Sequence, residues 1–325
     1  MLVFFIRRIK QSIVVLFVMS LIVFLGIYAI GNPVDILISP EADIAEQEAT
    51  IARLGLDRPI WEQYFVFLGN AVQGDLGKSF VHNEPALRLI LERFPATFEL
   101  ALGAMVLAIV IGIPAGMIAG LKPESRVGKT IMAGSILGFS LPTFWVGLML
   151  IMLFAVMLGW LPASGRGDTV DVFGIPFSFF TLDGLSHLFL PAFNLALFKM
   201  SLVIRLARAG TREVILSDYV KFARAKGLSQ NRIIGIHVLK NILIPIVTVL
   251  GLELGNVIAF AVVTETVFAW PGIGKLLIDS IGLLDRPVVV AYLLLTVSLF
   301  IVINLVVDLM YSVLDPRVRL GDIKS

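Results

Sequence analysis

The sequence predicts an all-α, polytopic membrane protein with six transmembrane helices and both termini in the cytoplasm. Three observations support this fold class. Hydrophobic residues make up 58% of the 325 positions and charged residues 15%, whereas soluble domains have about 45–50% apolar and about 25% charged residues. Six separate stretches are apolar enough to cross a bilayer, which takes about 20 residues each. Lys and Arg are concentrated in alternate connecting segments, as the positive-inside rule requires.

The six expected spans share a run of about 20 mostly apolar residues. They are 9–30, 98–120, 131–156, 186–206, 241–263 and 288–312. The fourth is the weakest, because Pro191, Asn194 and Lys199 interrupt it. The first could be a cleaved signal peptide. Its apolar run of about 18 residues exceeds that of a signal peptide and no small-residue cleavage site follows, so we expect a retained helix.

Positive charge sets the expected orientation, since 18 of the 26 Lys and Arg residues lie in cytoplasmic segments or in the cytoplasmic halves of the adjoining spans when both termini are inside. This orientation divides the chain into three expected parts. They are residues 1–97, with the first helix (9–30) and a long extracytoplasmic loop; residues 98–313, the main transmembrane domain with a cytoplasmic loop at 207–240; and a cytoplasmic tail at 314–325. Outside the membrane we expect an amphipathic helix at 42–54 and irregular structure at 159–185.

Several kinds of chemical site are excluded. The chain has no cysteine, and its three histidines lie far apart in sequence, so we expect no metal site. Gly74-Asp-Leu-Gly-Lys-Ser79 ends like a phosphate-binding loop, but Val72 stands where that loop needs its first glycine. Trp270-Pro-Gly-Ile-Gly-Lys275 contains only part of a dinucleotide-binding pattern. We therefore expect turns at both places, no nucleotide or other cofactor bound by this chain, and no nucleic-acid partner.

Polar and small residues inside the spans are the next candidates. Gly112, Gly116 and Gly120 recur every fourth residue in the second span, a spacing that lets helices approach closely in lipid. A pore-lining bend at Pro114 is the alternative to close packing. Glu253 lies near the middle of the fifth span without a visible partner, so it is expected either to face the translocation path or to make a buried polar contact.

Four other polar residues have expected places, and three of them are charged. Asn304 and Asp308 share a face of the sixth span, where we favour polar packing near its inner end. Glu99 and Lys199 lie near the ends of their expected spans and can reach the membrane interface.

The most informative segment is the long basic loop between the fourth and fifth spans. Residues up to Lys226 can form a short helix that Gly227 ends in the left-handed conformation, with a second helix starting at Leu228. Tyr219, Phe222, Ala223 and Lys226 recur at helical spacing and are expected to share one exposed face. We interpret the aromatic residues on this exposed loop as anchors for another protein, because aromatic side chains dominate protein interfaces. The alternative is a solvated basic hairpin attracted to anionic lipid.

At this point the residues resemble a family, the permease subunits of bacterial ABC importers of the peptide/nickel type (DppB/OppB-like, binding-protein-dependent transport). The strings that carry the resemblance are Leu54-Gly-Leu-Asp-Arg-Pro59, Gly74-Asp-Leu-Gly77, Phe94-Pro-Ala-Thr-Phe-Glu-Leu100, Leu141-Pro-Thr-Phe-Trp145, Asp218 to Gly227, Thr264-Glu-Thr-Val-Phe-Ala-Trp-Pro-Gly-Ile-Gly274, Val307-Asp-Leu-Met-Tyr311 and Asp315-Pro-Arg317. Two departures are present. Lys221-Phe-Ala223 stands for the Glu-Ala-Ala of the general loop pattern, and Gly31-Asn-Pro33 replaces the Gly-Asp-Pro of many relatives.

The resemblance implies a type I ABC importer transmembrane domain. Such a chain forms a pore for dipeptides or oligopeptides with a second, similar permease in the bacterial inner membrane. Two cytoplasmic ATPases, which bind ATP and Mg²⁺, would drive it, and an extracytoplasmic solute-binding protein would deliver the substrate. The resemblance places the ATPase-coupling loop at Glu213, Asp218, Tyr219, Phe222, Ala223, Arg224, Ala225, Lys226, Gly227 and Leu228. The chain itself is not expected to be an enzyme.

Other function classes stay open at this point. Relatives within the same importer class carry nickel chelates, glutathione or opines, so the solute is not fixed by the family. An ion-coupled secondary transporter would use Glu253 and Asp308 as coupling residues, but paired Gly/Pro-interrupted segments are not visible in the two halves. An intramembrane enzyme would need a nucleophile and base or metal ligands at membrane depth, and no such motif occurs.

Overall fold

The structure is a computed structural model that describes residues 2–30, 51–52 and 57–314, with side chains described for 6–26, 51–52 and 57–307. Most of the amphipathic segment expected at 42–54 and the tail after Leu314 lie outside the described residues. By its internal contacts the chain forms two compact units, one from Met1–Phe94 with Leu276–Ser325 and the other from Pro95–Lys275.

Five helices are long and apolar enough to cross a membrane, and a sixth crossing results if a bent helix pair is counted as one span. The five run within α1 (Leu2–Ile30), α5 (Ala86–Leu121), α8 (Leu182–Ile215), α11 (Leu239–Phe260) with the helical turns before it, and α14 (Arg286–Leu314). In α1 and α14 apolar residues surround the helix, as a lipid-exposed segment requires, whereas α8 is mostly buried inside the protein. The expected all-α class with six spans is therefore confirmed, with the third span formed by a bent pair of helices.

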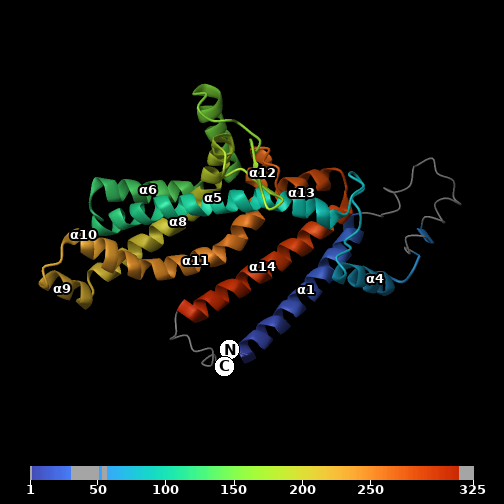
Figure 1. Cartoon of the computed structure of the whole chain (residues 1–325), viewed down its shortest axis with the longest axis horizontal. Helices are drawn as coiled ribbons and strands as arrows, with labels where there is room; N and C mark the ends of the chain where they lie inside the picture. Colours follow the sequence, from blue (N-terminus) through green and yellow to red (C-terminus); the bar gives the residue numbers. More distant parts are fainter. Residues whose placement is uncertain (1, 31–50, 53–56, 315–325) are drawn as a thin grey trace. The chain divides into compact units, whose positions relative to one another are not determined.

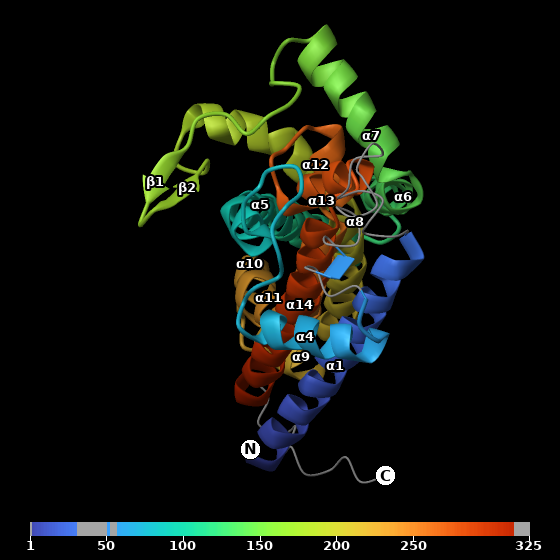
Figure 2. The same cartoon turned by 90° about the vertical axis from the view of Figure 1, so that its right-hand side faces the viewer.

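The third expected span, 131–156, is not one continuous helix. It consists of α6 (Arg126–Ser140), α7 (Thr143–Leu150) and the π-helical segment η1 (Ile151–Met157), and it bends by 109° between Ser140 and Thr143. Leu141 has φ −85° and ψ 139°, the extended conformation that the ring of a following proline imposes. Pro142 then begins α7, which leaves the end of α6 steeply (Figure 2). The prediction of one helix over 131–156 missed this break because the run stays apolar through it.

The first unit is built around α1 and α14, which lie side by side (Figure 1). The short helix α4 (Ile60–Val72) packs on α1 through Tyr64, whose hydroxyl lies 2.8 Å from Ser20 Oγ and whose ring contacts Phe24 at 5.3 Å between centroids. A buried Tyr needs a partner for its hydroxyl, and Ser20 supplies it within the span. In the same unit Asp285 accepts hydrogen bonds from Ser79 Oγ and Phe80 N–H.

The second unit has α8 at its centre. This helix contacts α6, α7 and α11, as well as α12 (Val262–Val267), and it carries the largest share of buried residues among the candidate spans. Its polar Asn194 and Lys199 therefore face other helices rather than lipid. The helix α13 (Ile273–Gly282) follows α12 after the Trp270–Pro271 turn.

The segment 159–185, expected to be irregular, contains a short antiparallel hairpin. Its strands are β1 (Val170–Val172) and β2 (Ile175–Phe177), with Val172 paired to Ile175. Phe173 and Gly174 have φ values of 55° and 81°, the conformation of a two-residue type I′ turn. Phe occupies a position that usually holds Asn, Asp or Gly, which is why the turn was not predicted.

Candidate functional site

The first candidate site is the helix α9 (Asp218–Ala225) at the end of the α8–α11 pair (Figure 1). It ends as the sequence predicts, with Gly227 at φ +77°. Gly227 N–H donates to Arg224 O at 2.9 Å and Leu228 N–H donates to Ala223 O at 3.2 Å. These two bonds are the pair that defines a Schellman helix end. The chain then turns sharply into α10 (Gln230–Arg232), which begins two residues later than the expected start at Leu228.

The exposed face of α9 carries two aromatic rings and a cation. Tyr219 is 42% exposed and Phe222 is 61% exposed, and Lys226 Nζ lies 4.6 Å from the centre of the Phe222 ring. Val220 and Ala223 are instead buried, and α9 contacts α8 and the π-helical segment η2 (Ile233–Val238). The expectation that Ala223 shares the exposed face is wrong, because the helix uses Val220 and Ala223 to pack on its own unit.

The charged residues of this loop are at its surface. Glu213, in the last turn of α8, and Arg224 and Ala225, in α9, are exposed. Lys221 Nζ donates to Asp218 Oδ1 at 2.8 Å, and this bond lowers the pKa of the fully exposed Asp218 carboxyl. Such an exposed pair contributes little to stability. The loop therefore keeps its shape through Val220, Ala223 and the Gly227 turn, and its charges stay available to a partner.

The second candidate site is a polar contact between α8 and α11. Lys199 Nζ forms an ion pair with Glu253 Oε2, and Asn256 Nδ2 donates to the same oxygen at 3.3 Å. The Lys199 and Glu253 side chains are 10% and 24% exposed. Glu253 thus makes a buried polar contact, one of its two expected roles, with a partner that the sequence alone did not show, and the Lys199 ammonium group pairs with α11. Burial of two charges requires such pairing, because either one alone would be strongly unfavourable in a low-dielectric region.

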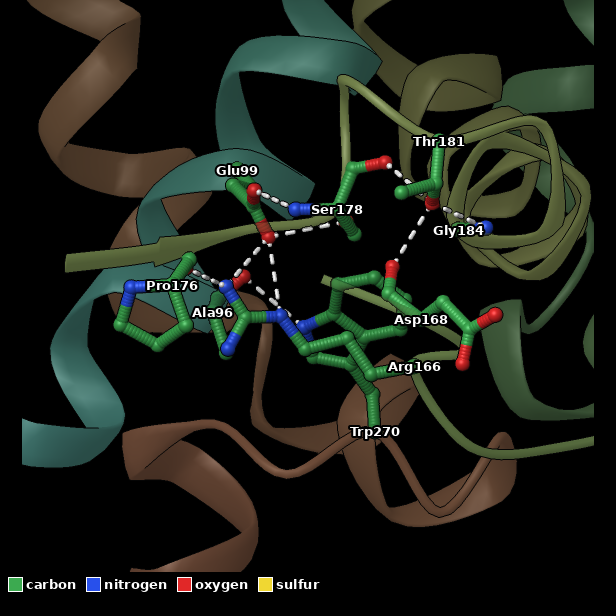
Figure 3. A network of polar contacts seen from close by, with 9 residues as sticks. All are labelled: Ala96, Glu99, Arg166, Asp168, Pro176, Ser178, Thr181, Gly184 and Trp270. Carbon is green, nitrogen blue, oxygen red and sulfur yellow. Dashed lines mark hydrogen bonds and ion pairs between the residues drawn. The ribbon is translucent and has the colours of Figure 1, made fainter. Parts of the chain in front are cut away.

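Glu99 was also expected to reach the interface, but it is fully buried at the centre of a polar network (Figure 3). Arg166 donates to Glu99 Oε2 through Nε at 2.9 Å and Nη2 at 2.7 Å. Ser178 donates to Glu99 through its N–H at 2.5 Å and its hydroxyl at 3.0 Å. Arg166 Nη2 also donates to Pro176 O. The network fixes the hairpin segment to the side of α5.

A second buried carboxylate, Glu265, organises the turn between α12 and α13. It accepts hydrogen bonds from Thr97 Oγ1 at 2.6 Å and Lys275 N–H at 2.9 Å. Burial raises the pKa of the Glu265 carboxyl, although these hydrogen bonds oppose the shift. The fully buried Trp270 donates from Nε1 to Ala96 O at 2.8 Å (Figure 3). The turn is therefore held on α5 by two independent anchors.

The three glycines of the second span lie against α8. A Cβ at Gly112 would be 2.9 Å from Val203, one at Gly116 would be 2.5 Å from Ile204 O, and one at Gly120 would be 2.8 Å from Thr211. These separations leave no room for a side chain. Helix α5 continues through Pro114 in the same packed arrangement.

The remaining sequence candidates lie in α14. Asn304 lines a groove between α1 and α14, whereas the side chain of Asp308 is outside the described residues. Among the residues that the structure does describe, no group of three or more His, Asp and Glu side chains could hold a metal ion.

The fold and the exposed loop helix define a class, the permease subunits of ABC importers, and comparison with known proteins identifies the family. Residues 112–320 match the family described as binding-protein-dependent transport system inner membrane component, and residues 1–101 match its N-terminal family. The chain belongs to this family and is a multi-pass protein of the bacterial inner membrane.

Full-length relatives are found among curated proteins. The chain is 42% identical to a di/tripeptide transport system permease protein, DppB, from Pseudomonas aeruginosa, over 98% of this chain and 99% of the relative. It is 38% identical to an oligopeptide permease, AppB, from Bacillus subtilis, over 97% and 99%. It is also 38% identical to a glutathione permease, GsiC, from Escherichia coli, over 98% and 99%.

A solved structure has the same fold. A chain of the inward-facing MetNI methionine ABC transporter matches with a TM-score of 0.54 and 17% identity, over 70% of this chain and 96% of that chain. The fold is therefore that of an ABC importer transmembrane domain.

Proposed function

We propose that this chain is one of two pore-forming permease subunits of an ABC importer that carries dipeptides or oligopeptides into the cell, driven by ATP hydrolysis on two partner ATPases. The full-length similarity to permeases named for dipeptides, di/tripeptides and oligopeptides supports the substrate class. Glutathione, itself a small peptide, is the nearest alternative, since a glutathione permease is almost as similar. The observation that carries the proposal is the exposed face of α9, which bears Tyr219 and Phe222, on a helix that ends in a Schellman motif at Gly227.

In this proposal α9 is the coupling element. Tyr219, Phe222 and Lys226 dock in a groove on an ATPase, where aromatic side chains contribute much of the binding free energy. Because Val220 and Ala223 are buried where α9 contacts α8 and η2, a displacement of α9 moves these elements with it. The π-helical segment η2 continues directly into α11. ATP-driven closure of the ATPases then rocks α8 and α11 and switches the pore between its two open states.

The pair formed by Lys199 and Glu253 is proposed to face the translocation path. A charged pair at membrane depth usually faces a cavity or a partner chain. The two groups match the carboxylate and the ammonium ion of a peptide, so the pair can open to receive the charged ends of the substrate. In a secondary transporter, the rival class, Glu253 would instead bind the coupling ion.

The proposed orientation places both termini and α9 in the cytoplasm, with a binding protein delivering substrate on the other side. The excess of Lys and Arg in 199–240 supports this orientation. A cysteine at Ser229 should react with an impermeant thiol reagent only from the cytoplasmic side, and one at Asn83 only from the opposite side. Reaction of both positions from one side would contradict the orientation.

The coupling role is tested by Phe222→Ala with Tyr219→Ala in the purified permease complex. Loss of two interface aromatics should weaken ATPase binding by about thirtyfold or more, because an anchor residue contributes about 2 kcal/mol or more. Phe180→Ala is the matched control, since Phe180 is an exposed aromatic (66%) on a different segment of the same unit.

Ala223→Glu belongs in the same experiment as a folding control. Ala223 is buried, so this change should disturb the packing of α9 itself. Unchanged ATPase binding in the double aromatic variant would overturn this role and would move the contact to the shorter loop at Lys122–Lys129.

A further inference from the structure

A groove of about 860 Å³ lies between α1 and α14, within the first unit. Its residues come from the first two thirds of α1, Arg7 to Met19, and from the middle of α14, Thr296 to Leu305. A cavity of this size is in the range that binds small organic ligands. Both walls are candidate membrane spans, so the groove lies along the hydrocarbon region of a bilayer.

The groove has two chemically different ends. Three cations within about one helical turn, Arg7, Arg8 and Lys10, line the end at the start of α1. The rest is mainly apolar, with Val14, Val15, Met19, Val297, Phe300 and Ile301 among its lining residues. Among the described residues, no carboxylate lines the groove.

The length of the groove matches one leaflet of a membrane. Arg7 and Met19 are twelve residues apart on a continuous helix, which corresponds to about 18 Å at 1.5 Å per residue. Half of the hydrocarbon core is about 15 Å thick. A ligand with an anionic head and an apolar tail would therefore place its head at the basic end while its chain covers the apolar part.

We propose that this groove binds one anionic phospholipid, such as phosphatidylglycerol, with its phosphate at Arg7 and Lys10 and an acyl chain along Val15, Val297 and Ile301. Ordinary lipid contact would cover an apolar helix face without regard to the head group. The basic end distinguishes this site, because basic pockets between transmembrane helices select anionic head groups. The bound lipid fills the space between α1 and α14 within the first unit.

The test uses the intact importer complex in nanodiscs made of phosphatidylcholine with a minor fraction of phosphatidylglycerol. Native mass spectrometry after detergent release counts the phospholipids retained by each complex. The wild type should retain one phosphatidylglycerol at this chain in preference to phosphatidylcholine. Arg7→Gln with Lys10→Gln should weaken this binding about thirtyfold, the effect expected from the loss of two basic residues near an anionic head group.

Two further variants separate a bound lipid from a general attraction to charge. Arg126→Gln with Lys129→Gln removes two cations from α6, which is outside the groove, and should leave the retained lipid in place. Val297→Trp fills the groove without changing its charge and should release the lipid. Retention that depends on the cations but not on Val297 would mean a diffuse surface effect and would overturn the proposal.

The other possible occupant is a helix of the partner permease. A photoreactive amino acid at Val15 should cross-link to phospholipid in the complex. Cross-linking to the second permease instead, with no phosphatidylglycerol retained, would also overturn the proposal. All variants are compared only where the complex elutes as a single assembled species, so that loss of lipid is not mistaken for loss of folding.

Discussion

Replacement of Arg166 by Met should release the hairpin segment from α5 without removing the chain from the membrane. Glu99 is fully buried, and Arg166 supplies both of the charged hydrogen bonds that reach it, at 2.9 and 2.7 Å. The Arg166 side chain is 12% exposed, so water screens the pair only weakly. The substitution keeps the length and apolar stem of the side chain and removes its charge.

The expected cost follows from the burial of the remaining charge. Removal of one partner from a buried ion pair costs about 3–5 kcal/mol, because the other charge stays in a low-dielectric site. Replacement of both partners costs less than the single change. In Glu99→Met with Arg166→Met the main loss is the Ser178 N–H, which no longer has an acceptor and costs about 1–3 kcal/mol. The double variant should therefore be more stable than Arg166→Met alone.

Hydrogen–deuterium exchange of the segment 160–181 measures this effect locally, which suits a membrane protein that does not unfold in one step. A loss of about 3 kcal/mol corresponds to exchange more than a hundredfold faster in that segment. Exchange in α9 should be unchanged, since α9 packs on the end of α8 and on η2. Additive effects of the two substitutions, or normal exchange in Arg166→Met, would refute the reasoning.

Three other predictions follow from the packing and the loop. Gly116→Val should separate α5 from α8 and reduce the yield of folded protein at a cost of about 1–3 kcal/mol or more, whereas Gly134→Val, where the added Cβ has no neighbour within 4 Å, should not; equal yields would contradict the close packing. Gly227→Val should destabilise the end of α9 by about 1–3 kcal/mol, because residue 227 has a positive φ, and faster amide exchange in α9 would measure this effect. Gly227→Asn should be better tolerated, and identical exchange in the two variants would argue against backbone strain. Lys199→Gln with Glu253→Gln, which leaves no charge unpaired, should lower peptide uptake without lowering the yield of the complex, and a parallel fall in yield would favour a purely structural ion pair.

Much of the fold was predictable from the sequence because lipid imposes a simple rule. Apart from closed β-barrels, only helices cross a bilayer, because a helix forms all the hydrogen bonds of its backbone within itself. Such a helix needs about 20 apolar residues. The residues at which the helices begin and end were less predictable. Helix α8 continues to Ile215, well past the expected end at 206, because its later turns are amphipathic rather than apolar. The bend after Leu141 was readable from Pro142, but hydropathy alone does not register it.

The candidate site was predicted in part. Local signals placed α9 and its end at Gly227 correctly, since a helix end depends on neighbouring residues. The assignment of Ala223 to the exposed face failed because the apolar residue that decides which side packs inward is Val220. A face predicted from Tyr219 and Phe222 alone would have been correct.

Long-range polar contacts were not predictable from local patterns. Lys199 and Glu253 are 54 residues apart, and Glu99 and Arg166 are 67 apart. The available signal was the presence of opposite charges in segments too apolar to tolerate them singly. That signal indicates that partners exist, but only the packing of α8 on α11 and of the hairpin on α5 decides which residues pair.

The central proposal is tested most directly by transport in liposomes that contain this chain, its partner permease and the two ATPases. Uptake of a labelled dipeptide should require ATP on the side of α9 and a binding protein on the other side, and Phe222→Ala with Tyr219→Ala should abolish it. Uptake driven by a proton or sodium gradient in the absence of ATP would contradict the assignment as an ABC importer permease.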